Sequence, residues 1–540
     1  MFGLPLFLLL GNFLPGSSLR LGEPPEMVKR ALQVVGQAVG RKKKPATPER
    51  TAPGGCRDLE VLVKGDTLRI LHMSDFHFHP TKGCNGGDVP EQALLREEEG
   101  GCSKATEEFV NKVTDEYLPE VDLVVLNGDL INWDAVRGDE TDLSKFLLEK
   151  PGFLRHFVDQ ANVQNVPVMV LLGNHDSPSM TCVDFNAENG KGPSVFDCDV
   201  SSFTVTFEQR IRKRRWGSVQ GMFSRSANLC TAPGDEVHGV GNLVVFANVN
   251  GKKVPLVFVD SGTALSLNVQ PFKEAEVKEV LYDWVRPSQV DWMKNRLANG
   301  HGESFRGTVP GFIFTHHPPA LTTRPVKTFH DSFALDNVKI LSGQMWVGSR
   351  NHGKPDQGEK GGEFRTVENF SCATSSESKR PLRPVISSSE YSTNPKENWK
   401  LNVREDKEGA EEEACAGAEE MEFFDGPSQD RGETLMQAAT SSRLIAALFS
   451  GHHHENDYCA IAEDTPVAFC YGGTAGYTAA TYEKAKEFGP RPRGAKLEHQ
   501  VRLIHYQLPK HGKARLSTRL IRDIYGGGTE LGPETVLPLA

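Results

Sequence analysis

The chain has 540 residues, of which 38% are hydrophobic and 24% are charged, so it is long enough to bury a sizeable core. Its formal net charge of −10 argues against non-specific nucleic-acid binding, which depends on a basic surface. The length is compatible with several domains, or with one large α/β domain that contains insertions.

The N-terminus has the pattern of a targeting segment. Residues 2–14 are apolar apart from glycine and asparagine, and small residues follow them. Although a basic n-region is missing, this pattern is typical of a secretory signal cleaved near Ser17, so we assign residues 1–20 to it and 21–60 to a linker. No other long apolar run occurs, so we expect no membrane span in the mature chain. These features predict a protein of the secretory pathway, either secreted or vacuolar.

The ten cysteines do not form a CxxC metal motif. An even number behind a signal-like segment predicts disulfides formed in an oxidising compartment. The alternative is that several are buried thiols. Sequence does not fix the connectivity, but three near pairs are plausible: Cys84/Cys102, Cys182/Cys198 and Cys459/Cys470.

From Leu68 onward, short apolar runs of strand length alternate with polar segments that are compatible with helices. Examples of the helical segments are Thr106–Tyr117 and Leu143–Asn162, and Asn250-Gly251 is typical of a tight hairpin turn. This alternation predicts an α/β sheet protein. We place the main domain at residues 61–510 and leave 511–540 as a C-terminal tail.

Two charged segments interrupt this pattern. Residues 345–432 are rich in Gly, Ser, Lys, Glu and Pro, which predicts a low-complexity insertion within the domain, disordered or a surface loop, rather than a functional acidic segment. The basic run Arg210–Arg215 could attract a phosphorylated substrate, but a solvated helix face is the simpler interpretation.

Residue types that bind metals follow five of the apolar runs. They occur in the motifs Asp75-Phe76-His77, Gly128-Asp129, Gly173-Asn174-His175-Asp176, His316-His317-Pro318 and Gly451-His452-His453-His454. In open α/β sheets, sites form at the carboxyl ends of strands, so these distant residues can converge at one edge. Each motif alone is weak evidence, since Asp and Asn also favour turns and helix caps.

Carboxylate, amide and imidazole ligands together favour Fe, Mn or Zn. Two such cations roughly 3.5–4 Å apart can hold a phosphoryl group and lower the pKa of a bound water. The motifs therefore predict hydrolysis of phosphate esters by a metal-bound hydroxide at a two-metal centre.

The order of these five motifs resembles that of the calcineurin-like metallophosphoesterase superfamily. Within it, the chain is most similar to the purple-acid-phosphatase-like proteins of plants and fungi that have a D-x-H motif. Segments 258–262, 282–293, 451–459 and 469–477 contain this closer similarity. The resemblance implies a four-layer α/β/β/α sandwich, in which two mixed sheets are flanked by helices.

The resemblance also implies a role for each site residue. The first metal would be bound by Asp75, His77, Asp129 and His454. The second would share Asp129 and add Asn174, His316 and His452. His175 would contact the scissile phosphate and act as general acid toward the leaving oxygen.

The chain departs from the purple acid phosphatases at two positions. Asn132 stands where many of them have a tyrosine that binds ferric iron, and His77 replaces a glycine. We therefore expect no purple chromophore. Asn132 could still hydrogen-bond His175, with Asp134 nearby, so we include Asn132 among the catalytic residues.

Some questions stay open at this point. His317 and His453 are expected to point away from the metals, because neighbouring strand side chains alternate. We expect a phosphomonoesterase acting on a phosphorylated small molecule or a phosphoprotein. A phosphodiesterase of the same superfamily and a non-catalytic phosphate-binding protein are the alternatives. The oligomeric state cannot be predicted.

Overall fold

The computed structural model divides the chain into two units, Met1–Gly55 and Cys56–Ala540. All described residues belong to the second unit. They are 58–80, 101–132, 135–137, 139–149, 152–177, 180–181, 207–232, 237–266, 281–282, 285–299, 308–319, 338–342, 345–347, 363–365, 434–454, 456–462, 465–477, 499–524 and 527–539. The predicted targeting segment and linker therefore lie outside the described residues, apart from the last residues of the linker.

One sheet, named here the β2 sheet, contains strands from both ends of the domain. Its order is β19-β18-β17-β2-β3-β4, and β20 also pairs with β18. The bounds are β2 Thr67–Met73, β3 Leu123–Asn127, β4 Val168–Leu171, β17 Gln500–Gln507, β18 Arg515–Asp523, β19 Thr529–Leu531 and β20 Thr535–Leu537. Strands β2, β3 and β4 are parallel, whereas β17 and β18 run antiparallel to their neighbours, so the sheet is mixed.

The other large sheet, named the β10 sheet, has the order β1-β6-β7-β10-β14-β16-β15-β11. The bounds are β1 Glu60–Leu62, β6 Leu243–Val249, β7 Lys252–Phe258, β10 Gly311–Thr315, β11 Val338–Ser342, β14 Ile445–Ser450, β15 Cys459–Ala462 and β16 Ala468–Tyr471. Strands β7, β10, β14 and β16 are parallel. Their carboxyl ends therefore lie along one edge of this sheet.

The two sheets pack face to face through an apolar core, and alternation along each strand decides which side chains enter it. In β2, Leu68 and Ile70 face the β10 sheet, whereas Leu71 and Met73 face the helices on the other side. In β10, Phe312 and Phe314 enter the core between the sheets, and Ile313 faces outward. Both sheets are thus buried on two faces, which explains their nearly continuous apolar runs.

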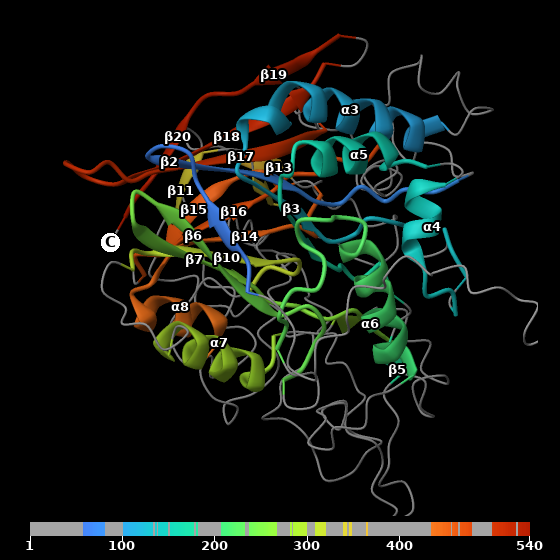
Figure 1. Cartoon of the computed structure of the whole chain (residues 1–540), viewed down its shortest axis with the longest axis horizontal. Helices are drawn as coiled ribbons and strands as arrows, with labels where there is room; N and C mark the ends of the chain where they lie inside the picture. The colour runs from blue at the N-terminus through green and yellow to red at the C-terminus, as the bar shows by residue number, and fades with distance from the viewer. Residues whose placement is uncertain are drawn as a thin grey trace, which may run out of the picture. The chain divides into compact units, whose positions relative to one another are not determined.

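Helices cover both outer faces, and those at residues 101–117 and 287–299, for example, lie on opposite sides of the sheets in Figure 1. The β2 sheet is covered by α3 Gly101–Tyr117, α4 Leu143–Leu148, α5 Arg155–Val163 and α6 Phe207–Gln220, with the 3-10 turn η2 Leu118–Glu120 after α3. The β10 sheet is covered by α7 Pro287–Asn299 and α8 Leu435–Ser442. The predicted α/β/β/α sandwich with two mixed sheets is confirmed.

Short strands complete the described part of the chain. They are β5 Met180–Thr181, β8 Ala264–Ser266 and β9 Leu281–Tyr282, which pair together, and the pair β12 Met345–Val347 and β13 Glu363–Arg365. Apart from β12 and β13, the predicted insertion 345–432 lies outside the described residues. Within the described part, none of the helices is long and apolar enough to cross a membrane.

Several predicted elements can be compared with the structure. Asn250 and Gly251, both at positive φ, form the turn between the antiparallel strands β6 and β7, as predicted. The helical segment 143–162 is two helices, because Gly152 adopts a left-handed conformation between α4 and α5.

The predicted C-terminal tail was wrong. Residues in 511–540 form β18, β19 and β20, and β18 pairs with β17 over its whole length. Leu516 and Leu537 are buried in the core between the sheets, and Ile521 is buried in the core on the helix side. The sheet therefore extends beyond residue 510.

The interpretation of Arg210–Arg215 as a solvated face was also wrong for two of its residues. Arg212 and Arg215 are 3% and 1% exposed, whereas Arg210, Lys213 and Arg214 are exposed. Residues three apart lie on the same face of a helix. Arg212 and Arg215 therefore both point into the protein, while the other basic residues of the run lie on the exposed face of α6.

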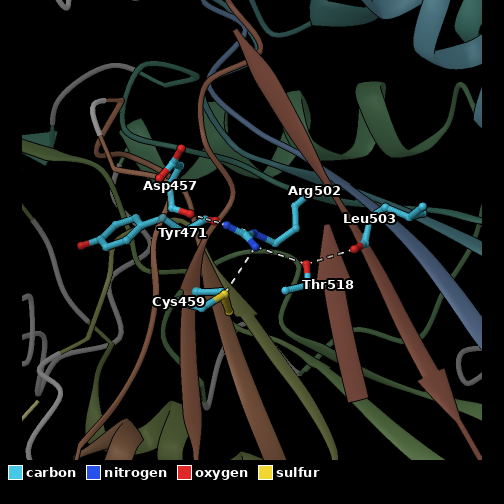
Figure 2. Close-up of a disulfide and its surroundings, with 7 residues drawn as sticks. Asp457, Cys459, Tyr471, Arg502, Leu503 and Thr518 are labelled. Carbon is cyan, nitrogen blue, oxygen red and sulfur yellow. Dashed lines mark hydrogen bonds between the residues drawn. A yellow bond between two sulfur atoms is a disulfide. The ribbon is translucent and has the colours of Figure 1, made fainter. Parts of the chain in front are cut away.

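A buried arginine joins the two sheets beside a disulfide that lies within the β10 sheet (Figure 2). Cys459 and Cys470 face each other on β15 and β16 and form the disulfide, which confirms that predicted pair. Arg502 on β17 donates to Cys459 Sγ (3.3 Å), Tyr471 O (2.7 Å) and the carbonyl of Asp457. Cys102 and Cys230 are also disulfide-bonded. The predicted pairs Cys84/Cys102 and Cys182/Cys198 lie partly or wholly outside the described residues.

Candidate metal centre

The predicted ligands converge where parallel strands of both sheets end. Hydrogen bonds between loop backbones hold neighbouring strand ends together, as between Asp75 N and Gly128 O (3.0 Å) and between Gly451 N and His316 O (3.1 Å). The two sheets are joined at the same place, because His452 N donates to the Asp75 carboxylate (3.0 Å). Residues 377 positions apart in the sequence therefore meet at one edge.

Four of the predicted residues form a first group: Asp75, His77, Asp129 and His454. Their potential ligand atoms all lie within 4.8 Å of one another. Nε2 of His77 lies 2.9 Å from Nε2 of His454 and 3.4 Å from Oδ2 of Asp129. Electron pairs brought this close repel unless a proton or a metal cation lies between them.

A second group consists of His316, His317 and His452 around the side chain of Asn174. Each of these imidazoles has a ring nitrogen 3.0–3.3 Å from Asn174 Oδ1. His316 Nδ1 and His317 Nδ1 lie 2.8 and 3.1 Å from the carbonyls of Asn127 and Ser261. Since a carbonyl only accepts, these Nδ1 atoms donate, and in the neutral rings Nε2 keeps its electron pair for a ligand role.

His317 is the residue for which the sequence prediction was wrong. It was expected to point away, but its ring lies in the second group and is buried. Alternation applies within a strand, and β10 ends at Thr315, two residues earlier. His453 packs against Tyr471 with ring centroids 5.6 Å apart and lies outside both groups. His301, His330 and His352, which the sequence predicts to be surface residues, lie outside the described residues.

Asp129 lies between the two groups. Its Oδ2 is 3.4 Å from His77 Nε2 and 3.3 Å from His316 Nε2. This oxygen is buried and accepts no hydrogen bond within the described residues, while Oδ1 accepts from His175 N (2.8 Å). Burial alone would raise the pKa of Asp129, but the surrounding imidazoles hold it well below its usual range, so the carboxylate is ionised.

These residues fit a pair of transition-metal ions. A buried carboxylate oxygen without a hydrogen-bond donor is costly unless a cation binds it. The mixture of imidazole, carboxylate and amide ligands favours Fe, Mn or Zn over Ca. Asp75, His77, Asp129 and His454 would hold one ion, and Asn174, His316 and His452 would hold the other together with Asp129.

The backbone around the site is unusual. Asp75, His77, Asp129 and His452 all have positive φ, between 49° and 73°, which is uncommon for residues with a side chain. Such conformations cluster at functional sites. Gly173 allows the close approach of two loops, because a Cβ there would lie 2.1 Å from Asp129 Oδ1. These left-handed backbone conformations mark the site in the structure, and they could not be predicted from the sequence.

The two predicted catalytic residues, His175 and Asn132, do not form the hydrogen bond that was expected between them. His175 lies beside the first group, with its ring centroid 4.5 Å from that of His77. Burial lowers the pKa of His175, although Asp129 opposes this. Within the described residues, Asn132 does not hydrogen-bond His175, and Asn132 Oδ1 and His175 Nδ1 are both buried without a hydrogen-bond partner. Asp134 lies outside the described residues.

Asp176, the last residue of the Gly173–Asp176 turn, has a structural role that sequence reasoning missed. Its Oδ1 accepts from the backbone of Leu130 and Ile131, and its Oδ2 accepts from Gly173 N. Burial and the neighbouring Asp129 raise the pKa of Asp176 to about 6. This side chain thus holds the turn after β4 against the turn after β3.

Comparison with protein families gives a match over residues 68–341, just over half of the chain, to the family described as calcineurin-like phosphoesterase. The matched region contains five of the seven predicted metal ligands: Asp75, His77, Asp129, Asn174 and His316.

Two curated relatives and one solved structure illustrate what the chain is similar to. "Probable inactive purple acid phosphatase 28" of Arabidopsis thaliana is 25% identical over 253 residues, which cover 47% of this chain and 53% of that protein. "Uncharacterized protein C1020.05" of Schizosaccharomyces pombe is 35% identical over 111 residues, 20% of this chain and 18% of that protein. Thus the chain spans about half of the first relative and less of the second. Purple acid phosphatase PPD1 of yellow lupin aligns at 8% identity with a TM-score of 0.35, over 88% of this chain and 54% of that chain.

Proposed function

Since this chain belongs to the calcineurin-like phosphoesterase family, we propose that it hydrolyses phosphate monoesters at a two-metal centre. The observation that supports this most directly is the position of Asp129, whose buried carboxylate lies between two groups of ligands. A carboxylate in this position would serve both cations of a two-metal hydrolase.

The chemistry divides between the ions and the chain. When bound, two ions would polarise the phosphoryl oxygens and lower the pKa of an attacking water. Asn174 and the imidazoles of the second group would hold one of the two ions. His175, whose backbone N–H donates to Asp129 Oδ1, would donate a proton to the leaving oxygen.

Two substitutions test this proposal. Asp129→Asn removes the charge between the two groups, and His175→Ala removes the proposed acid. We expect each to reduce hydrolysis of p-nitrophenyl phosphate by about 10²-fold or more, in line with loss of an acid–base group. Circular dichroism would check that the variants fold. Two folded variants with wild-type rates would disprove the proposal.

A parallel assay with bis(p-nitrophenyl) phosphate tests the choice between monoesters and diesters. We expect the monoester to have the higher kcat/KM. The reverse preference would assign the chain to phosphodiesterase activity instead.

A second candidate is a non-catalytic phosphate-binding protein, which is suggested by the word "inactive" in the name of the Arabidopsis relative. The complete set of predicted ligands in this chain supports catalysis instead. Elemental analysis and phosphate titration of the same preparation separate the two. Bound metal and bound phosphate without turnover of any ester would favour the second candidate.

We also propose that the protein matures in the secretory pathway. The apolar segment 2–14 and the buried Cys459–Cys470 disulfide support this. N-terminal sequencing of protein from its native cells should find a chain that begins after about residue 17. Retention of Met1 would contradict the proposal.

A further inference from the structure

Helix α6 directs a guanidinium group toward the turn that contains two of the proposed active residues. Arg212 is buried, with 3% of its surface exposed, beneath the turn Gly173–Asp176 that follows β4. This turn contains Asn174, a proposed metal ligand, and His175, the proposed acid. None of the residues that Arg212 contacts here belongs to the predicted ligand set.

All five N–H donors of Arg212 have acceptors. Nη1 donates to Gly173 O (2.8 Å) and Ser177 Oγ (2.7 Å), and Nη2 donates to Leu172 O (2.8 Å). The remaining donors of Nε and Nη2 go to the two carboxylate oxygens of Asp260. A guanidinium has five donors in a fixed plane, so this arrangement fixes three acceptors of the turn relative to one carboxylate.

Asp260 is itself fixed. It follows β7 in the β10 sheet, and its carboxylate also accepts from the backbone of Val240 (2.6 Å) and Gly262 (3.0 Å). Burial would raise the pKa of Asp260, but Arg212 outweighs this and lowers it, so the pair is ionised. Arg212 thus connects the turn after β4 in one sheet to the end of β7 in the other.

A hydroxyl chain supports the same turn from the side of Asp260. Arg212 and Thr263 both contact Ser177 Oγ, and Thr263 Oγ1 donates to Asn174 O (3.2 Å). The carbonyls of Leu172, Gly173 and Asn174 are therefore held by Arg212 and Thr263. These are the backbone groups that set the direction of the Asn174 side chain.

We propose that Arg212 is a positioning residue for the metal centre: through Leu172 O, Gly173 O and Ser177, it sets where Asn174 and His175 lie. This inference rests on the proposed function, because it concerns the second metal group and the proposed acid. Arg212 does not touch the substrate. It acts by holding the turn at the distance from Asp129 that ligation requires.

The test compares the same change, arginine to lysine, at two positions of helix α6. Arg212→Lys keeps a charge but cannot satisfy five planar acceptors, whereas Arg214→Lys changes an exposed residue of the same basic run. For Arg212→Lys in the full chain, we expect the affinity for the second Zn²⁺, measured by chelator competition, to fall by about 10–100-fold. We expect kcat on p-nitrophenyl phosphate to fall by a similar factor with KM little changed. Arg214→Lys should stay within about twofold of wild type, since it leaves the turn untouched.

A milder variant covers the case in which Arg212→Lys does not fold. Thr263→Val removes the hydroxyl that contacts both Asn174 O and Ser177 Oγ but leaves Arg212 in place, and we expect a loss of a few-fold in the second Zn²⁺ affinity. The proposal is overturned if a folded Arg212→Lys matches Arg214→Lys in both readouts. It is also overturned if Arg212→Lys cannot fold and Thr263→Val binds Zn²⁺ like wild type.

The Zn²⁺ titration separates this inference from the proposed function. If wild-type protein binds Zn²⁺ but hydrolyses no ester, the proposed function fails. A weaker second site in Arg212→Lys than in Arg214→Lys would then still support the positioning role, whereas equal affinities would end it.

Discussion

The two groups of candidate ligands differ in charge. The first group contains two carboxylates, Asp75 and Asp129, with His77 and His454. The second contains three imidazoles and the Asn174 amide, so it has no carboxylate of its own among the described residues and shares Asp129, 3.3 Å from His316. Opposite charge dominates ion binding at short range in a buried site. The difference predicts a tightly held first ion and a second ion that is easier to remove.

The largest effect on kcat/KM is expected when one ligand is substituted in each group in turn. Asp75→Asn removes a negative charge from the first group, and we expect a loss of about 10³-fold in kcat/KM, comparable to losing a major electrostatic contribution. Asn174→Ala removes a neutral ligand, and we expect a loss of about 10–100-fold. Elemental analysis should find the first ion missing in Asp75→Asn and retained in Asn174→Ala. Equal metal loss in both variants would contradict the comparison.

Stepwise removal of metal from wild-type protein should show the same difference. We expect a chelator titration with two phases at least about tenfold apart in concentration, because the second group has less negative charge. Activity should disappear with the first phase, and re-addition of one equivalent of metal should restore it. A single phase would show that the two ions bind with equal strength.

A smaller effect is expected for His317, which the structure places in the second group. His317→Gln should weaken the second metal site by a few-fold to tenfold, while the first site stays unchanged. His511→Gln, at an exposed position, is the matched control. Unchanged affinity in His317→Gln would mean that this imidazole is a structural neighbour of the site.

The smallest expected effect concerns acid stability beside the site. His72 is fully buried, and burial, with Arg502 and His316, lowers its pKa to about 3. The folded protein therefore keeps His72 neutral, while the unfolded chain binds a proton below its pKa of 6.5. Stability should fall as the pH drops from about 6.5 toward 3, by about 1.4 kcal/mol per pH unit for this group.

Urea unfolding at pH 6 and pH 5, with metal removed by a chelator, measures this slope. His72→Gln should be less stable at pH 7, because it alters the hydrogen bond with Asn127 Nδ2 (2.9 Å). Its stability should nevertheless depend less on pH. A variant with the wild-type slope would show that other groups cause the acid sensitivity.

The strands and the ligands could be predicted from the sequence because both signals are local. Runs such as residues 123–126 are apolar throughout, and each is followed within a few residues by a polar residue of ligand type. The burial of Arg212 could not be predicted from a rule about charge runs, because its acceptors come from segments 35–48 residues away. The inward position of His317 depends on where β10 ends, and strand boundaries are the least predictable feature.

The contact between Asp75 and His452, two residues far apart in the sequence, has a consequence for biosynthesis. A ribosome must translate beyond residue 454 before a complete ligand set exists, and β17 and β18 of the β2 sheet emerge later still. Such non-local pairing is slow, because a long loop must close before its contacts form. We therefore expect metal uptake to follow synthesis, and chains truncated before residue 450 to emerge without the second ion.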